Sequence, residues 1–369
     1  MKAEHFQGDP LKADLLQAIL RGDLKPGERL PPFRTLATRY KVSLNTVQRV
    51  VGTLVDDKVL ETTQGRGTFV STARRLSAAT SFAVGLFVHT SGHFFGPLFD
   101  SLRETLAQHG AMPIVCDFSD EPLEYVRHTR LRELIDGKLR SFVVDGSIAT
   151  NPALSNVFLA KRLQQWTDRI RDLTVINRWE HPQRVPGSYF LFDYQGAGMQ
   201  IAQYLMGLGH RRIVLHTFGS PLAPGAYESD IHDGMIRFSN SCAHQGLRIE
   251  FCSQQHPLGL AEIASLFSTS DRPTAVVAVT DYLARPWFDR LATLGLRVPQ
   301  DVSIMGFYNT PHATEMPVPL TSVQLNTERL VLQVTHHIVA AHAATEPTRE
   351  EQFIGASLVL RSSCAPAHR

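Results

Sequence analysis

The sequence predicts an α/β fold, with a small N-terminal domain followed by a larger, two-lobed domain built on doubly wound parallel sheets. Two observations carry this prediction. Residues 1–72 hold amphipathic helical stretches and one pair of short β-prone runs. From residue 82 onward, apolar runs such as "FAVGLFV", "SFVVDG" and "AVVAV" alternate with helical stretches, which is the pattern of buried parallel strands connected by helices.

Length and composition favour several domains. With 369 residues, 43% of them hydrophobic and 20% charged, the chain is too long for one ordinary core and too apolar for disorder. We place the first domain at residues 1–72, a linker of small, polar and basic residues at 73–81, and the second domain at 82–369. The second domain has too many strands for one sheet, so two lobes are expected.

Three helices and a hairpin are predicted in the first domain. Residues 10–21, "PLKADLLQAILR", repeat apolar side chains at helical spacing behind a proline suited to a first helical position. A short helix at 32–40 follows, and Ser43 stands at the N-cap of a third amphipathic helix. The runs "VLETT" and "GTFV", joined by "QGRG", complete a winged helix-turn-helix. The residues expected to face inward are Leu11, Leu15, Ala18, Ile19, Leu36, Ala37, Tyr40, Val47, Val50, Val51, Leu54 and Val55.

Positive charge is concentrated in this domain. Residues 1–75 hold 13 Lys and Arg against 8 Asp and Glu, whereas the remainder holds 24 against 27. A basic end of this kind favours a polyanion as the partner. Arg66 lies between two glycines at the hairpin tip, where it can enter a narrow minor groove or bind a phosphate. The alternative is a surface hairpin with a solvated arginine.

The stretch "PGERLPPFRTLATRYKVSLNTVQRVVGTLVDDKVLETTQGRGTFV" resembles the DNA-binding domain of the GntR regulator family over almost the whole domain. The resemblance implies DNA contacts from the second helix, the third (recognition) helix and the wing. Two arginines common in that family are replaced by Leu44, which could touch a thymine methyl, and Gln48, which could pair with an adenine edge. An ordinary solvated helix face is the alternative for Gln48 and Arg49. The candidate DNA-binding residues are Arg34, Ser43, Leu44, Asn45, Thr46, Gln48, Arg49, Gly65, Arg66 and Gly67.

Residues 82–365 resemble the effector domain of the LacI/GalR repressors, which is itself similar to periplasmic sugar-binding proteins. The stretches "MQIAQYLMGLGHRRIVLH" and "LATLGLRVPQDVSIMGF" carry much of this resemblance. It implies a two-lobed, periplasmic-binding-protein-like fold with a sugar-like ligand held between the lobes, at the carboxyl ends of the strands. For any single Asp or aromatic residue at a strand end, a helix cap or core packing is an equal alternative. The residues that match ligand positions are His89, Phe94, Phe95, Asp145, Asn177, Arg178, Asp193, Tyr194, Asp281, Tyr308 and Gln324.

Two positions depart from that family's ligand-binding pattern. Ile231 stands where an arginine often holds ligand oxygens, if "IHDGM" is the matching stretch. Tyr308, in "GFYN", replaces a carboxylate. A pocket without these charges favours a less polar or differently shaped ligand, and loss of ligand binding is the other interpretation.

Several enzyme and cofactor chemistries are disfavoured by the sequence. GntR-type domains also occur fused to pyridoxal-phosphate domains, but no lysine follows Lys161, which excludes a Schiff base in the C-terminal half. The G-x-S-x-G and G-x-x-x-x-G-K-[ST] motifs are absent. The four cysteines form no C-x-x-C pair. His336, His337 and His342 share one predicted helix without neighbouring metal-ligand types, so we expect a solvated helix face there, with no metal and no cofactor.

A ligand-responsive transcriptional regulator is the function that these features predict. We expect a repressor that binds, as a homodimer, a pseudo-palindromic operator in double-stranded DNA, with a sugar-like effector in the cleft. The N-terminus has no apolar signal segment and no stretch is apolar enough to span a membrane, which predicts a cytoplasmic protein without a membrane partner. The alternatives are an enzyme or a non-signalling binding protein, such as a transport protein, that uses the α/β cleft.

Overall fold

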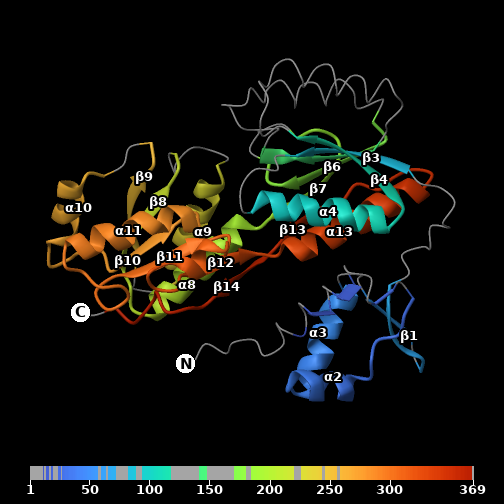
Figure 1. Ribbon diagram of the computed structural model, residues 1–369, viewed down its shortest axis with the longest axis horizontal. Coiled ribbons are helices and arrows are strands. Elements are labelled where there is room, and N and C mark those ends of the chain that lie inside the picture. The colour runs from blue at the N-terminus through green and yellow to red at the C-terminus, as the bar shows by residue number, and fades with distance from the viewer. Residues whose placement is uncertain are drawn as a thin grey trace.

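The computed structural model shows a winged-helix domain and a two-lobed α/β domain (Figure 1). The residues that it describes are 11, 14–15, 18–19, 24–25, 27–56, 60–63, 65–71, 82–88, 94–117, 141–147, 170–179, 184–219, 226–242, 246–255 and 258–367.

The N-terminal domain is a winged helix-turn-helix, as predicted. α2 (Phe33–Tyr40) and α3 (Leu44–Asp56) precede an antiparallel hairpin of β1 (Leu60–Thr63) and β2 (Gly67–Val70). Residues 11, 14–15 and 18–19, which belong to the predicted first helix, are helical. The core contains Leu11, Leu15, Ile19, Leu36, Val47, Val50, Val51 and Leu54, with Ala37, Tyr40 and Val55 partly buried around it.

The first lobe is a parallel sheet with the strand order β13-β7-β6-β5-β3-β4. Two helices that pack against each other, α4 (Phe95–Gln108) and α13 (Thr327–Ala343), lie along this sheet in Figure 1. The strands are β3 (Phe82–Val88), β4 (Ala111–Asp117), β5 (Ser141–Asp145), β6 (Asp172–Asn177), β7 (Ser188–Phe192) and β13 (Glu351–Ile354).

The second lobe is a sheet with the strand order β14-β12-β11-β10-β8-β9, and of these described strands only the edge strand β14 runs antiparallel to its neighbour. The strands are β8 (Arg212–Thr217), β9 (Arg248–Ser253), β10 (Ala275–Ala278), β11 (Ser303–Phe307), β12 (Thr321–Leu325) and β14 (Ala356–Val359). The helices are α8 (Tyr194–Gly207), α9 (Tyr227–Ser241), α10 (Leu260–Phe267), α11 (Asp281–Thr293) and α12 (His312–Glu315).

Among the described elements, the chain passes between the lobes three times, from β7 to α8, from β12 to α13 and from β13 to β14. Each lobe is therefore completed by segments that are distant in sequence. β5, β6, β7, β10 and β11 are buried along their whole length, which explains why they read as continuous apolar runs. This arrangement confirms the two-lobed, doubly wound α/β fold.

The three histidines of α13 do not lie on a solvated helix face, and this expectation was wrong. His337 is 5% exposed, and its Nε2 lies 3.3 Å from a carboxylate oxygen of Asp172. The ring of His342 stacks on that of Phe82, with 3.9 Å between the centroids. Burial lowers the pKa of His336 to about 4. The reason is that α13 packs against the first-lobe core on one side and the winged-helix domain on the other.

Within the described ranges, no cluster of three or more His, Cys, Asp and Glu side chains is arranged to hold a metal ion. None of the helices in the same ranges combines the length and the apolar character that crossing a membrane requires.

Candidate functional site

α3 presents an exposed polar face opposite its buried one. Ser43 caps the helix, because the Thr46 N–H donates to the Ser43 Oγ at 3.1 Å, and the two side-chain oxygens lie 2.8 Å apart. The predicted N-cap is therefore confirmed. Four of the candidate DNA-binding residues, Leu44, Asn45, Gln48 and Arg49, are exposed on this helix, and Arg34 is exposed on α2. A helix with such a face has the size and polarity to enter a major groove.

The wing is a tight hairpin with an exposed arginine at its tip. Thr63 pairs with Gly67, and the Arg66 N–H donates to the Thr63 carbonyl at 3.0 Å. Gly65 and Gly67 have φ angles of 75° and 115°, which residues with a Cβ rarely adopt. The glycines on either side of Arg66 are thus required by the turn, and they hold the arginine out into solvent.

Arg29 is a second cation at the wing, and sequence reasoning missed it. The residue is exposed and forms a backbone bridge with Phe69 on β2. A Cβ built on Gly67 would lie 2.8 Å from the Arg29 Nε, so the guanidinium packs directly on the wing backbone. In the sequence, Arg29 stands out only as a basic residue in the turn before α2. The structure shows that this turn runs beside the hairpin.

A cluster of aromatic rings joins the two lobes. Tyr308 follows β11 in the second lobe, and its ring centroid lies 4.4 Å from that of Phe94 and 6.5 Å from that of Phe95. Phe94 and Phe95 stand at the start of α4 in the first lobe, with their own centroids 5.1 Å apart. Three of the predicted ligand-site residues therefore meet across the boundary between the lobes.

A chain of buried hydrogen bonds connects Asp145, Asn177 and Tyr194. The Asn177 side-chain amide donates to the Asp145 Oδ1 at 2.9 Å, and the Tyr194 hydroxyl donates to the Asn177 Oδ1 at 3.1 Å. Burial raises the pKa of Tyr194 well above its usual value, and the neighbouring Tyr308 hydroxyl adds to this rise. Burial raises the pKa of Tyr308 to about 12, so this hydroxyl stays protonated at neutral pH.

Arg178 brings a positive charge to the boundary between the lobes. Its guanidinium carbon lies 4.6 Å from the ring centroid of Tyr227, on α9 of the other lobe. Burial raises the pKa values of Asp145, Glu228 and Asp230, and the nearby charge of Arg178 opposes the rise in each case. One cation with three carboxyl groups offers both donors and acceptors to a polar ligand.

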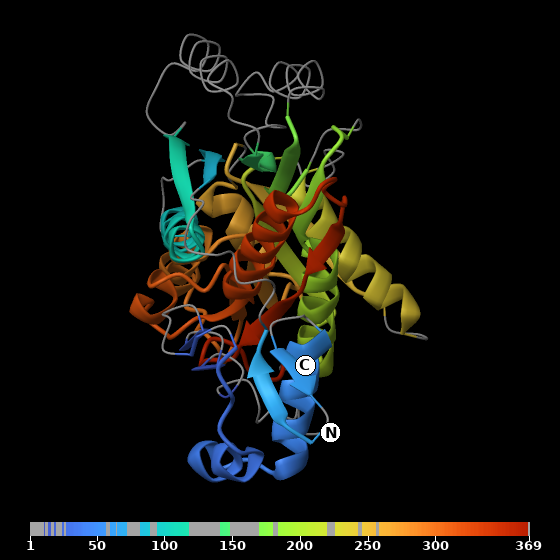
Figure 2. The same cartoon turned by 90° about the vertical axis from the view of Figure 1, so that its right-hand side faces the viewer.

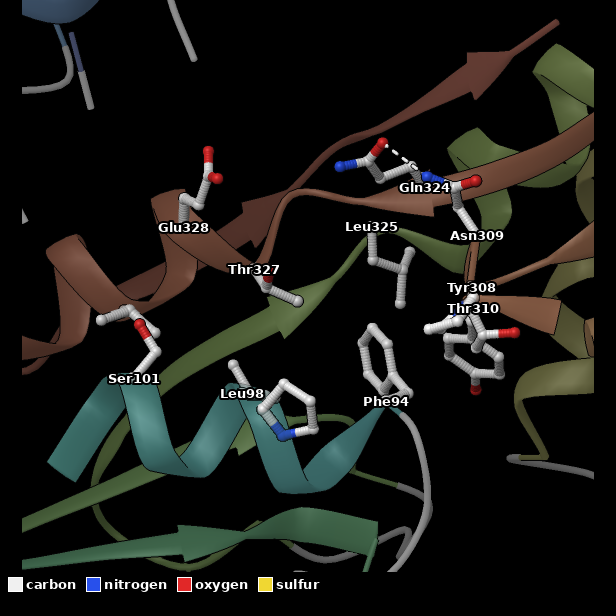
Figure 3. Close-up of a pocket in the computed structure, with 13 residues that line it drawn as sticks. Phe94, Leu98, Ser101, Tyr308, Asn309, Thr310, Gln324, Leu325, Thr327 and Glu328 are labelled. Atoms are coloured by element: carbon white, nitrogen blue, oxygen red, sulfur yellow. Dashed lines mark hydrogen bonds between the residues drawn. The ribbon is translucent and has the colours of Figure 1, made fainter. Parts of the chain in front are cut away.

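A pocket of about 300 Å³ lies between α4 of the first lobe and the segments after β11 and β12 (Figure 3). The amide of Asn309 donates to the Gln324 Oε1 at 3.1 Å, and the Arg361 guanidinium donates to the Asn309 Oδ1 at 2.6 Å. The lining residues are Phe94, Pro97, Leu98, Ser101, Tyr308, Asn309, Thr310, Pro311, Gln324, Leu325, Thr327, Glu328 and Val331. The pocket brings together three predicted ligand residues, Phe94, Tyr308 and Gln324.

Asp281 stabilises the loop after β11, which lines this pocket. Its side chain is 0% exposed. The Oδ2 accepts hydrogen bonds from the N–H and the hydroxyl of Thr310, at 2.6 Å and 2.9 Å, and the Oδ1 accepts one from the Ser322 hydroxyl at 2.6 Å. The carboxylate thereby fixes the loop that carries Tyr308, and a direct contact between Asp281 and a ligand stays a prediction.

The remaining predicted positions are spread around the boundary between the lobes. Asp193 caps α8, since its Oδ1 accepts a hydrogen bond from the Gly196 N–H at 2.7 Å. Ile231, the first departure from the expected pattern, is 0% exposed and packs in the core. His89 lies outside the described residues.

Left-handed backbone conformations mark the same region. Asn177 has a φ of 73°, Tyr308 of 84° and Asn309 of 48°, although none of them is glycine. These residues stand at the carboxyl ends of β6 and β11, where open α/β sheets bind ligands. Strained residues of this kind persist where the surrounding structure holds them, and they cluster at functional sites. Asn309 was missed by sequence reasoning, although it directly follows Tyr308.

Comparison with known families assigns both parts of the chain. The model of bacterial regulatory proteins of the gntR family matches residues 8–70, and the model of the periplasmic binding protein-like domain matches residues 202–364. The chain carries a GntR-type DNA-binding domain and a LacI-type, periplasmic-binding-protein-like domain. Both resemblances seen in the sequence are thereby confirmed.

Three known proteins illustrate what this chain resembles over most of its length. The arabinose metabolism transcriptional repressor of Geobacillus stearothermophilus is 25% identical over 327 residues, 85% of each chain. The HTH-type transcriptional repressor PurR of Vibrio vulnificus is 24% identical over 68% of this chain and 72% of its own. A LacI family transcriptional regulator from Enterococcus faecium, solved with bound ribose, shares the fold with a TM-score of 0.58 at 19% identity, over 78% of this chain and 100% of that chain. The protein is therefore a DNA-binding transcriptional regulator and not an enzyme.

Proposed function

We propose that this regulator is a cytoplasmic, homodimeric repressor whose affinity for a pseudo-palindromic operator is controlled by a sugar bound between the lobes. The observation that carries the proposal is the presence, in one chain, of an exposed recognition face and a pocket of about 300 Å³ between two lobes. The relative named for arabinose metabolism supports a sugar as the ligand class. A ligand controls DNA binding only if it binds one arrangement of the lobes better than the other.

The pocket offers the two kinds of surface that a sugar requires. Phe94 and Tyr308 provide ring faces for the CH groups of the sugar ring. Gln324, Asn309 and Glu328 provide donors and acceptors for its hydroxyls. A volume of about 300 Å³ is at the lower end of the range for small-molecule pockets, which favours a monosaccharide over a larger ligand.

Asp145 provides an acceptor at the neighbouring lobe boundary. Its Oδ1 accepts hydrogen bonds from Asn177 and from the Ser147 N–H, whereas its buried Oδ2 has no hydrogen-bond partner among the described residues. A buried carboxylate oxygen without a hydrogen-bond partner carries a desolvation cost. A ligand hydroxyl that donated to this oxygen would remove that cost. We therefore propose Asp145 as a ligand contact, together with Phe94, Tyr308 and Gln324.

In the proposed DNA complex, α3 lies in the major groove and Arg66 enters the adjacent minor groove, with Arg29 beside it on the wing. Leu44 and Gln48 then stand where base edges pass, in place of two arginines. An operator read by these residues would depend less on guanine than usual, because arginine is the side chain that pairs bidentately with guanine.

Isothermal titration calorimetry of the full chain with L-arabinose, D-ribose and D-glucose tests the ligand. We expect one of them to bind, and Gln324→Ala to weaken binding at least tenfold because the pocket loses an amide. Gln108→Ala, an exposed glutamine at the end of α4 outside the pocket, is the matched control and should leave the affinity unchanged. Equal affinities for the two variants would remove this pocket from the proposal.

Fluorescence anisotropy with duplexes selected from a random pool tests the DNA site. Arg66→Ala should weaken binding and reduce the salt dependence of log K by about one if the guanidinium contacts phosphate. Arg248→Ala is the control, since its side chain is 73% exposed on the second lobe. Adding the sugar should lower the affinity of the wild-type protein. DNA binding that no sugar alters would instead support a non-signalling binding domain.

A further inference from the structure

α13 contacts two separate parts of the molecule. Leu330, Val331, Val334 and Ile338 belong to the core of the two-lobed domain. Leu332 is equally buried, at 1% exposed, but it belongs to the core cluster of the winged-helix domain. The two sets lie on different faces of the helix, as their spacing requires.

The surroundings of Leu332 confirm that the winged helix lies against α13. A cavity of about 450 Å³ separates the two domains beside this contact. Its walls on the winged-helix side are Val55, Leu60, Glu61, Thr62 and Ser71, and those on the other side are Gln333, His336, His337, Ala340, Glu350 and Gln352. Figure 1 and Figure 2 both show the hairpin and the end of α3 below α13.

This contact leaves the DNA-binding face uncovered. Val55 and Leu60, which face α13, are at the end of α3 and the start of β1. Gln48, Arg49 and Arg66, by contrast, are exposed. The winged helix can therefore bind DNA while it remains docked, and the docked position fixes the direction in which it presents α3.

The N-terminal part of the same helix lines the ligand pocket. Thr327, Glu328 and Val331 are among the pocket residues, and Leu332 follows Val331 directly. Glu328 and Leu332 are separated by four residues, or about 6 Å along a helix axis. A shift of the N-terminal end of α13 on ligand binding would therefore be transmitted to Leu332, because the helix is a rigid element.

We propose that α13 carries the docking surface for the winged-helix domain, centred on Leu332, and that through this contact the pocket controls how the two DNA-binding domains of a dimer are oriented. The docking itself is independent of any ligand. The control exerted by the pocket rests on the function proposed above.

Small-angle X-ray scattering of the full chain tests the docking. Leu332→Glu places a carboxylate against the winged-helix core, so the domain should detach and the radius of gyration should increase. Leu332→Met preserves the apolar contact and should leave the scattering unchanged. Leu260→Glu is the matched control, because Leu260 is 49% exposed on α10 and makes no part of the contact. Leu332→Ala serves as a milder test should the glutamate variant not fold, and it should give a smaller increase. A scattering curve of Leu332→Glu that superimposes on that of the wild type would overturn the proposal.

Operator binding with and without the sugar tests the control by the pocket. Leu332→Glu should bind the sugar within twofold of the wild type, whereas the factor by which sugar changes operator affinity should fall to about one. A full sugar response in Leu332→Glu would show that the signal takes another route. Absence of any sugar response in the wild type would contradict the proposed function, while the scattering result would still decide the docking.

Discussion

At the scale of single residues, Tyr308 has two roles at once. Its ring packs against Phe94 and lines the pocket, and its hydroxyl lies close to that of Tyr194. Its backbone is held in the left-handed region, with a φ of 84°. The residue that departs from the LacI/GalR pattern therefore joins the two lobes rather than leaving a gap in the site.

Tyr308→Phe separates these roles, because it removes the hydroxyl and keeps the ring. Tyr194 would still donate to Asn177 but would lose the polar neighbour at its hydroxyl, so we expect the free energy of unfolding to fall by about 1 kcal/mol. Urea denaturation followed by fluorescence measures this change. Sugar affinity should stay within a few-fold of the wild type, since the ring face remains. A change below about 0.3 kcal/mol would mean that water takes the place of the Tyr308 hydroxyl beside Tyr194.

Residues whose role depends on nearby sequence could be predicted, and those that depend on tertiary partners could not. Ser43 was identified as an N-cap from its position alone, and the hydrogen bond from Thr46 confirms it. Asp281 was predicted as a ligand contact, but its partners Thr310 and Ser322 lie 29 and 41 residues away. No local pattern reveals that the loop after β11 folds back onto this carboxylate.

At the scale of elements, replacing a glycine with alanine is expected to destabilise the wing but to stabilise the recognition helix. Gly67 has a φ of 115°, and an added Cβ would lie 2.8 Å from the Arg29 Nε. Gly52, in the middle of α3, is exposed and has nothing within 4 Å of an added Cβ. Gly67 is therefore required by its left-handed backbone and by the nearby Arg29 side chain, whereas alanine fits at the position of Gly52.

Gly67→Ala should therefore destabilise the winged-helix domain by at least about 1 kcal/mol and weaken DNA binding, because the wing tip must distort. Gly52→Ala is the matched control and should stabilise α3 by about 0.5–1 kcal/mol, since alanine is the better helix former. Chemical denaturation of the full chain, with anisotropy on the selected duplexes, measures both effects. Stabilisation by Gly67→Ala would refute the strained-turn description of the wing.

Elements were predictable where the period of apolar residues reports burial directly. Buried strands such as β5 and β10 were identified as continuous apolar runs, and the hairpin was recognised from its glycines. α13 was misjudged because its histidines are polar in sequence yet are covered by other elements in the fold. The element was predicted, but the burial of its second face depends on a domain about 260 residues earlier, and periodicity carries no such information.

At the scale of the whole molecule, buried and partly buried histidines link stability to pH. Burial lowers the pKa values of His210, His216 and His336 to about 4 in each case. His210 illustrates the cause: it is 1% exposed, with its ring nitrogens 2.8 Å from the Thr274 hydroxyl and 3.1 Å from the Ala365 carbonyl. These two partners fit a neutral ring, in which one nitrogen accepts and the other donates.

The direction of the pH effect follows from these shifts. An unfolded histidine titrates near pH 6.5, so between pH 6.5 and about 4 the unfolded chain binds protons that the folded chain does not. Each of the three histidines therefore destabilises the fold as the pH falls through this range. The buried carboxyls of Asp145, Glu228 and Asp281 act in the opposite direction, because burial raises their pKa values and the folded state holds their protons more tightly. The wild-type pH profile is thus a sum of opposing contributions, and a single histidine is isolated only by comparing variants.

His210→Gln makes that comparison, since glutamine keeps one donor and one acceptor but does not titrate. The variant will be less stable at pH 7, because its hydrogen-bond geometry is imperfect. The informative quantity is the loss of stability between pH 7 and pH 5, which should be smaller in the variant by up to about 2 kcal/mol, the amount that a pKa near 4 implies at pH 5. Urea denaturation at the two pH values measures it. If the wild type and His210→Gln lost equal stability between pH 7 and pH 5, His210 would be accessible to protons in the folded state, and the closure of the second-lobe core over this ring would have to be reconsidered.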